Sequence, residues 1–117
     1  MTGPPTRQTV TPGLIPRHRH VEGYVAVVLS GGYEEAGDQG RRRLTPGDVV
    51  VHRPWEAHLN RTSACAEVLN LPLPAGTLAP FGRIAEVDAV VRAAAIDPLE
   101  AAAHLAEAFE PAPLRLE

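Results

Sequence analysis

Residues 1–83 consist of short apolar or alternating segments separated by turn residues. Valine, leucine and threonine are frequent in these segments, and glycine, proline and aspartate lie between them, as in Gly31-Gly32 and Pro46-Gly47-Asp48. Short segments at close, fairly regular spacing are typical of a sandwich or barrel of antiparallel strands. The pattern predicts strands over residues 7–10, 18–30, 33–36, 41–44, 49–53, 57–62 and 65–71.

The segment Tyr24–Leu29, with the sequence YVAVVL, is apolar at both sets of alternating positions. A strand with one face in water alternates between apolar and polar side chains, so this strand is expected to be covered on both faces. One face can look into a barrel. The C-terminal third of the chain is expected to cover the other.

From about Ile84 the composition changes to alanine, valine, leucine and glutamate. A first apolar stripe at helical spacing consists of Ile84, Val87, Val91 and Ala94. Asp97-Pro98-Leu99-Glu100 then has the form of a helix start, with aspartate as N-cap, proline at the first helical position and glutamate in a capping-box position. A second stripe consists of Leu99, Ala102, Ala103, Ala106 and Phe109, before Pro111 and Pro113. Within one domain overall, the sequence predicts a barrel over residues 1–83 and a pair of short helices over 84–117, packed on the barrel or at a dimer interface.

Length and charge narrow the classes of function. A chain of 117 residues corresponds to one domain, and a net charge of −3 gives no general attraction to nucleic acid or to an anionic membrane. The run Arg41-Arg42-Arg43 is interpreted as a solvated edge strand that its charge protects from aggregation. Cys65 is the only cysteine and is expected to be a buried thiol. The sequence lacks a membrane-length apolar run and a signal-peptide core, so a cytoplasmic location is expected.

His18 and His20 lie one residue apart, just before the apolar segment. Residues two apart on a strand share a face, so the two imidazoles would project together, with Glu22 and Tyr24 on the same parity. Two imidazoles are a partial metal-coordination set that a carboxylate or phenol could complete. An exposed polar strand end would carry the same residues, so both interpretations stay open.

A third histidine, His58, follows some forty residues later. The Pro46-Gly47-Asp48 turn leads into a strand that ends near His52, and a loop with Trp55 precedes His58, which can face back across the sheet toward the first pair. His52 is expected to lie beside a site rather than to coordinate. Trp55 either lines the entrance of a binding pocket with its aromatic ring or is buried in the core beneath the loop, as a core plug.

These features resemble the two sequence motifs of the cupin superfamily. The match spans roughly residues 14–62 and consists of His18-x-His20, Gly31, Pro46–Val51 and Pro54-x-x-x-His58 with Asn60. More narrowly, the chain resembles the N-terminal cupin domain of AraC-type transcription regulators in Tyr24, in the strand ending at Ser30-Gly31-Gly32 and in the trailing pair of helices. The resemblance implies a cupin (jelly-roll) barrel that holds a small-molecule effector and forms a homodimer through its outer helices.

The resemblance also implies a binding site. It makes His18, His20 and His58 candidate ligands of a divalent metal, which could be Zn²⁺, Fe²⁺, Ni²⁺ or Mn²⁺. Many regulator-type cupins have lost the metal, so a metal-free barrel is the alternative. The residues predicted to contact a bound ligand are Glu22, Tyr24, His52 and Trp55.

The chain departs from the cupin motifs at two places. Tyr24 and Val25 occupy the positions where the first motif usually carries its glutamate ligand. Glu56 stands where the second motif usually has glycine. The fourth metal ligand is therefore left unassigned.

The sequence leaves three interpretations of the function open. The leading prediction is the ligand-sensing domain of an AraC-like regulator without its DNA-binding region, because residues after Asp97 leave no room for helix-turn-helix units. This chain itself is then expected to bind no DNA. The alternative is a stand-alone metal-dependent cupin enzyme of isomerase or dioxygenase type, which is less favoured because the only general acids or bases in view are Glu22, Tyr24 and Glu56. The third is a dimerisation module without a ligand.

Overall fold

The computed structural model describes residues 7–19, 21–37, 40–74, 76 and 78–113, and for His18 it describes the backbone alone. The strands in these residues are β1 (Arg7–Val10), β2 (Gly13–Arg19), β3 (Tyr24–Ser30), β4 (Tyr33–Gly37), β5 (Gly40–Leu44), β6 (Asp48–His52), β7 (Ala57–Thr62), β8 (Ala66–Pro72), β9 (Phe81–Arg83) and β10 (Glu110–Pro111). The helices are α1 (Val87–Ala94) and α2 (Pro98–Ala108). Neither helix of this described part is long and apolar enough to cross a membrane.

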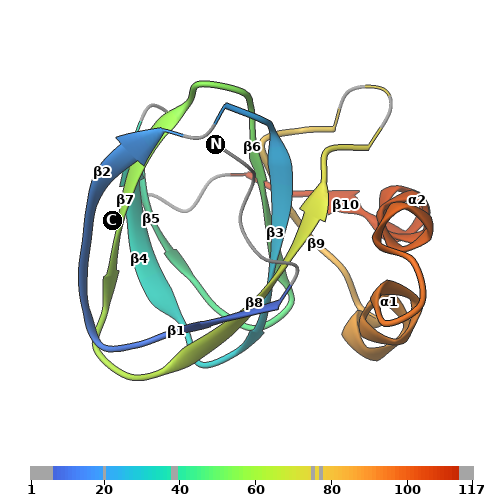
Figure 1. Ribbon diagram of the computed structural model, residues 1–117, viewed down its shortest axis with the longest axis horizontal. Helices are drawn as coiled ribbons and strands as arrows, with labels where there is room; N and C mark the ends of the chain where they lie inside the picture. Colours follow the sequence, from blue (N-terminus) through green and yellow to red (C-terminus); the bar gives the residue numbers. More distant parts are fainter. Residues whose placement is uncertain (1–6, 20, 38–39, 75, 77, 114–117) are drawn as a thin grey trace.

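Two antiparallel sheets face each other and form a barrel (Figure 1). One sheet has the order β1-β8-β3-β6-β9-β10, and the other has the order β2-β7-β4-β5. The first eight strands thus alternate between the sheets as 1-8-3-6 and 2-7-4-5, which is the arrangement of a double-sheet jelly roll, the architecture of cupins. The predicted fold class, a mainly β jelly-roll barrel with two C-terminal helices, is confirmed.

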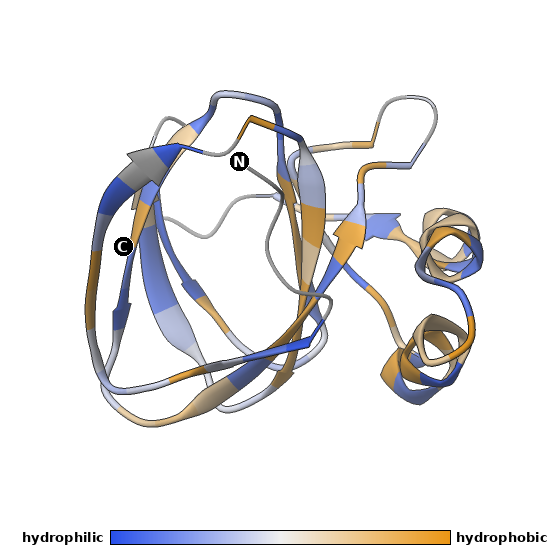
Figure 2. Cartoon of the chain, viewed as in Figure 1, coloured by the Kyte–Doolittle hydropathy of each residue, from blue (hydrophilic) through white to orange (hydrophobic). Residues whose placement is uncertain are grey.

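Strand β3 is buried on both faces, as its apolar pattern predicts. Val25 and Val27 belong to the core that packs against the helices. Ala26 and Val28 belong to a second core inside the barrel. The helices lie against the outer face of the larger sheet, where hydrophobic residues of β3 and of the helices come together (Figure 2). The fold therefore has three layers, and the interior core lies between the two sheets.

Helix α2 begins as the sequence predicts. The Asp97 side chain accepts a hydrogen bond of 3.0 Å from the Leu99 backbone N–H, and Pro98 is the first helical residue. The buried stripe differs from the expected one: Ala101, Ala102 and Leu105 are buried, whereas Leu99 is 68% exposed. Alanine is so frequent here that the apolar pattern alone does not define the face that packs on the sheet.

The prediction of a single strand over residues 18–30 is wrong. Strand β2 ends at Arg19 and pairs with β7, whereas β3 begins at Tyr24 and pairs with β6 and β8 in the other sheet. The chain crosses between the sheets in the intervening residues, and a hydrophobic pattern does not reveal such a crossing. Glu22 and Tyr24 therefore do not continue the strand face that carries His18. Two short strands, β9 and β10, were not predicted and pair with each other.

Two further expectations are corrected by the burial of side chains. Strand β5 does lie at the edge of its sheet, and Arg41 and Arg43 are exposed, but Arg42 is only 2% exposed. Alternation along β5 places Arg42 inside, on the face that carries Leu44. Cys65 is exposed, because β8 begins one residue later with the buried Ala66.

Candidate metal centre

Three buried side chains from both sheets meet inside the barrel. Glu35 lies on β4 and His58 on β7 of the smaller sheet, and His52 lies at the end of β6 in the larger sheet. One potential metal-ligating atom from each residue lies within 4.8 Å of those of the other two. These three residues are called the interior cluster below.

Strand geometry explains how the interior cluster forms. Tyr33 and Glu35 are two residues apart on β4 and both are buried, and His52 follows Val50 on the inner face of β6. Close approach of β4 and β7 depends on a glycine: a Cβ atom at Gly37 would lie 2.8 Å from the His58 Cα atom. This approach brings His58 beside Glu35.

The contacts form a continuous chain of five side chains. Glu35 Oε1 is 3.1 Å from His52 Nε2 and 3.4 Å from His58 Nδ1. The other nitrogen of His52, Nδ1, is 3.1 Å from Glu56 Oε1. The other nitrogen of His58, Nε2, is 3.4 Å from the Tyr24 hydroxyl. The two imidazole rings stand edge to face, with centroids 4.2 Å apart.

The carboxyl group of Glu35 is buried but has two imidazoles beside it. Burial alone would raise the pKa of Glu35, but the His52 and His58 imidazoles hold it well below its usual range. Burial alone would lower the pKa of His52, but the carboxylates of Glu35 and Glu56 raise it to about 9. Without a metal, Glu35 is thus a carboxylate and His52 an imidazolium at neutral pH.

Tyr24 is a neutral phenol at the edge of the cluster. Burial, followed by the negative charges of Glu35 and Glu56, holds the pKa of Tyr24 well above its ordinary value. Its ring centroid is 4.9 Å from that of His52. The Tyr24 hydroxyl therefore keeps its proton across the physiological pH range.

The interior cluster fits a divalent transition metal. Glu35 Oε2 is buried and has no hydrogen-bond partner among the described residues, which is the situation that a bound cation would resolve. Ligand atoms around an ion with bonds of about 2.0–2.2 Å lie roughly 3–4 Å apart, so atoms within 4.8 Å of one another need only small shifts to converge. Two imidazoles and one carboxylate suit Zn²⁺, Fe²⁺, Ni²⁺ or Mn²⁺.

The predicted metal ligands have different positions. His58 is a member of the interior cluster. The backbone of His18 pairs with that of His58 across β2 and β7, and its side chain is not among the described groups. His20 lies outside the described residues.

The residues predicted to contact a ligand also separate into two groups. Tyr24 is buried beside the cluster, whereas His52 is a member of it, although the sequence led us to expect His52 beside the site. Glu22 is exposed in the turn before β3. Trp55 is 60% exposed, so its interpretation as a core plug is wrong.

Glu35 was not identified from the sequence as a site residue. A signal existed in the alternation of β4 and β5, where Tyr33 opposes Leu44 and Glu35 opposes Arg42. If Tyr33 and Leu44 face the core, the Glu35–Arg42 pair must do so too. Charged side chains are usually exposed, and the Arg41-Arg42-Arg43 run was interpreted as solvated, so the pairing of Glu35 with Arg42 was not considered.

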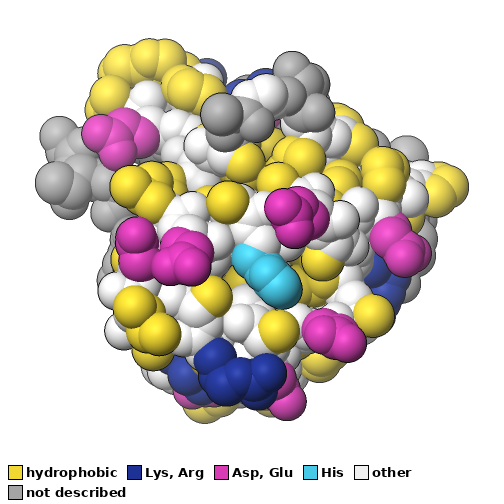
Figure 3. Space-filling view, turned by 90° about the vertical axis from the view of Figure 1, so that its right-hand side faces the viewer, with side chains coloured by type: hydrophobic (Ala, Val, Ile, Leu, Met, Phe, Trp, Pro, Cys, Tyr) yellow, Lys and Arg dark blue, Asp and Glu magenta, His cyan; other side chains and the backbone are white. Residues whose placement is uncertain are grey.

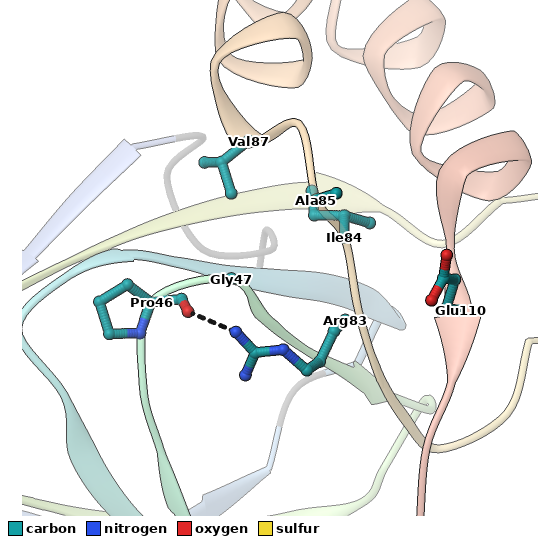
Figure 4. A pocket seen from close by; sticks show the side chains of 7 residues that line it. All are labelled: Pro46, Gly47, Arg83, Ile84, Ala85, Val87 and Glu110. Carbon is teal, nitrogen blue, oxygen red and sulfur yellow. Dashed lines mark hydrogen bonds between the residues drawn. The ribbon is translucent and has the colours of Figure 1, made fainter.

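A separate pocket lies outside the barrel and does not include the cluster. It has a volume of about 380 Å³ and is lined by Pro46, Gly47, Arg83, Ile84, Ala85, Val87 and Glu110 (Figure 4). Arg83 crosses it, donates a 3.0 Å hydrogen bond to the Pro46 carbonyl and forms an ion pair with the buried Asp48. Arg83 thus fastens β9 to the turn before β6, which is a structural role.

No protein-family model matches the chain, and no curated protein sequence matches it. Among solved structures it is similar to a conserved protein of unknown function from Streptococcus pyogenes, with 24% identity, coverage of 53% of this chain and 55% of that one, and a TM-score of 0.48. A cupin-2 domain protein from Shewanella frigidimarina has 17% identity over 55% of this chain and 63% of that one, with a TM-score of 0.49. A predicted oxalate decarboxylase from Thermotoga maritima has 22% identity over 55% of this chain and 59% of that one, with a TM-score of 0.48.

The matched region thus spans less than two thirds of the length of each of these three proteins. Identities below 25% and TM-scores below 0.5 carry no function across to this chain.

Proposed function

We propose that this chain is a jelly-roll domain that holds a divalent transition metal in its interior and binds a small molecule there. The observation that carries the proposal is the buried interior cluster, whose side chains are 2–4% exposed and whose Glu35 Oε2 has no hydrogen-bond partner in the described part of the chain. Burying ionisable groups is costly, and apolar residues of similar volume often stabilise a core at least as well. A binding role explains why this core carries them.

In this proposal, Glu35, His52 and His58 hold the metal. The metal supplies a Lewis-acidic position for an oxygen or nitrogen donor of the small molecule, because three protein ligands leave at least one position open. Tyr24 serves as a neutral hydrogen-bond donor beside that position. His52 must lose its Nε2 proton when the metal binds, so metal affinity should rise with pH.

Metal content and metal affinity test the proposal. Purified protein is stripped with a chelator, reloaded with Zn²⁺, Ni²⁺, Mn²⁺ or Fe²⁺, and analysed by elemental analysis and calorimetry. We expect one metal per chain, and for Glu35→Gln an affinity at least tenfold lower. Glu34→Gln, which alters the neighbouring side chain on the opposite face of β4, is the matched control and should bind as the original protein does. A protein that takes up none of the four metals contradicts the proposal and leaves the cluster as a closed ion network.

We further propose that the domain serves as the small-molecule sensor of an AraC-like regulator. Support comes from the sequence motifs over residues 14–62 and from the enclosed site, since a ligand held between two sheets can alter the packing of both. Thermal unfolding of the metal-loaded protein with sugars, amino acids and aromatic acids tests this proposal, because the midpoint should rise with the concentration of a true effector. An absence of any shift across these three classes counts against the sensor.

A homodimer is part of the sensor proposal. Ile96, in the turn between the two helices, and Leu99, in the first turn of α2, are 85% and 68% exposed. The face over the helices mixes apolar and acidic side chains with a basic group and a histidine (Figure 3). Light scattering during size-exclusion chromatography should give twice the mass of one chain, and Leu99→Glu should shift it to one chain. A monomeric mass for the original protein contradicts the dimer.

A stand-alone enzyme of dioxygenase type is the second candidate. It is favoured by one observation: in the described residues the cluster consists of two histidines and one carboxylate, which is the donor set of many non-haem iron oxygenases. Oxygen consumption by the Fe²⁺-loaded protein, with catechols and small organic acids as substrates, distinguishes the two functions. Substrate-dependent uptake that is lost in His58→Ala favours the enzyme, whereas ligand-dependent stabilisation without uptake favours the sensor.

A further inference from the structure

We propose that Glu56 is a positioning residue for the metal centre, which accepts a hydrogen bond from His52 and thereby aims the opposite nitrogen of that imidazole into the barrel. The inference rests on the proposed metal site. Glu56 lies in the loop between β6 and β7 and was expected from the sequence only as a candidate acid or base. It has a different part in the structure, because its carboxylate contacts the ring of His52, one of the proposed metal ligands.

The two nitrogens of His52 face two carboxylates. Nδ1 is 3.1 Å from Glu56 Oε1, and Nε2 is 3.1 Å from Glu35 Oε1. The Glu56 side chain is 13% exposed, so its contact with His52 is partly shielded from water. The ring of His52 is also held between those of Tyr24, at 4.9 Å, and His58, at 4.2 Å between centroids. Its orientation is thus restrained from four directions.

This arrangement determines which nitrogen can bind a metal. A neutral imidazole carries one proton and one lone pair, and the hydrogen bond made by one nitrogen decides which atom keeps the proton. When a metal replaces the Nε2 proton, the Glu56 carboxylate opposite Nδ1 would retain the remaining proton there, so that the lone pair of Nε2 faces Glu35 and the interior. In metal sites, a carboxylate commonly accepts a hydrogen bond from the histidine nitrogen that does not bind the metal, which also makes the metal-binding nitrogen more basic.

The loop is shaped to deliver this carboxylate. The Glu56 backbone N–H donates a 3.1 Å hydrogen bond to the Arg53 carbonyl, which closes a tight turn. Trp55 has a φ of 66°, in the left-handed region, and the Arg19 guanidinium donates to its carbonyl. As a result Trp55 is turned outward while Glu56 is turned back toward His52. In the cupin motif that this segment resembles, glycine usually stands at this position, so the carboxylate is a feature of this chain.

The first experiment compares Zn²⁺ and Co²⁺ binding by the full chain carrying Glu56→Ala, Glu56→Gln or Glu107→Ala. Glu107 is an exposed glutamate on α2 and serves as the control. Glu56→Ala should keep one metal per chain but bind it about 10- to 100-fold more weakly, and it should change the visible spectrum of the Co²⁺ form. Glu56→Gln, whose amide oxygen can still accept from Nδ1–H, should recover most of the affinity, and Glu107→Ala should match the original protein.

The second experiment needs no variant and uses nitrogen-15 NMR of the histidine rings in the Zn²⁺-loaded protein. The inference requires that His52 keeps its proton on Nδ1 and binds through Nε2. Binding through Nδ1, or an affinity of Glu56→Ala within twofold of the original with an unchanged Co²⁺ spectrum, overturns the role of Glu56 while leaving the metal site intact. An original protein that binds neither Zn²⁺ nor Co²⁺ overturns the proposed metal site and this inference with it.

Discussion

Glu35 and Arg42 face each other across β4 and β5, and both side chains are only 2% exposed although β5 is an edge strand. Their closest charged atoms are 3.7 Å apart, and the Arg42 guanidinium also lies 5.9 Å from the centre of the Phe81 ring. An edge strand therefore contributes a buried cation to the interior of the barrel. Glu35 is shared between this cation and two imidazoles, which connects the interior cluster to the stability of the smaller sheet.

Replacing Arg42 by methionine should therefore destabilise the protein strongly. Removing one partner of a buried ion pair typically costs about 3–5 kcal/mol, and because Glu35 would keep its contacts with two imidazoles we expect the lower end, about 3 kcal/mol. Arg43→Met, on the exposed face of the same strand, should change the free energy of unfolding by less than about 0.5 kcal/mol. Urea denaturation of the metal-free proteins measures both. Equal effects of the two substitutions would show that Arg42 is not buried.

The stability of the metal-free protein should fall as the pH rises above neutrality. The pKa of His52 is raised to about 9 in the folded protein, compared with about 6.5 in the unfolded chain. The ion pairs of His52 therefore contribute fully to stability below about pH 6.5, and this contribution is lost as the pH rises through about 9. The loss should be on the order of a few kcal/mol, because each change of one in pKa corresponds to about 1.4 kcal/mol. Glu35 acts in the opposite sense, because its lowered pKa supplies stability that is lost only in acid.

Urea denaturation between pH 6 and 10 measures this dependence. The variant His52→Gln removes the titrating group and should give a much flatter profile over the same range. A profile of the original protein that is flat from pH 6.5 to 9.5 would contradict an imidazolium at position 52.

Gly37→Ala should disturb both the fold and the metal site. Its Cβ atom would lie 2.2 Å from the Ala57 carbonyl oxygen and 2.8 Å from the His58 Cα atom, so β4 and β7 would have to separate. We expect a loss of about 3 kcal/mol in the free energy of unfolding and weaker metal binding. Gly76→Ala is the control: the new Cβ atom would have no atom within 4 Å, so only the strain of its positive φ of 88° remains, which should cost about 1 kcal/mol. Comparable losses for the two variants would argue against close packing at Gly37.

Trp55→Asn should leave stability nearly unchanged. The side chain is 60% exposed, and asparagine tolerates the positive φ of 66° better than tryptophan does. We expect a change of less than about 1 kcal/mol, whereas removal of a buried tryptophan typically costs about 3–5 kcal/mol. Trp55 is the only tryptophan, so its fluorescence also reports directly on its surroundings. Emission from a solvent-exposed indole that a bound effector quenches would support the predicted ligand contact, and an emission that no effector alters would count against it.

The sequence by itself determined the class of fold and most of the elements. Alternation and turn residues placed six of the seven predicted strand segments near their observed positions, and the buried pattern of residues 24–29 required a cover that the C-terminal helices provide. The start of α2 followed from Asp97 and Pro98, because capping depends on neighbouring residues alone. Local interactions were sufficient for each of these conclusions.

Only the tertiary structure decided which side chains meet. Tyr24 does not lie on the strand face of His18, because the two residues belong to strands of different sheets. Glu35 lies close to His52 and His58 because strands β4, β6 and β7 meet across the barrel. Hydrophobic periodicity shows which face of a strand is buried, but not what lies opposite that face, and it ranks a charged residue as exposed by default. A carboxylate becomes an interior ligand only when the two sheets close around it with compensating charges, and that depends on contacts between residues far apart in the chain.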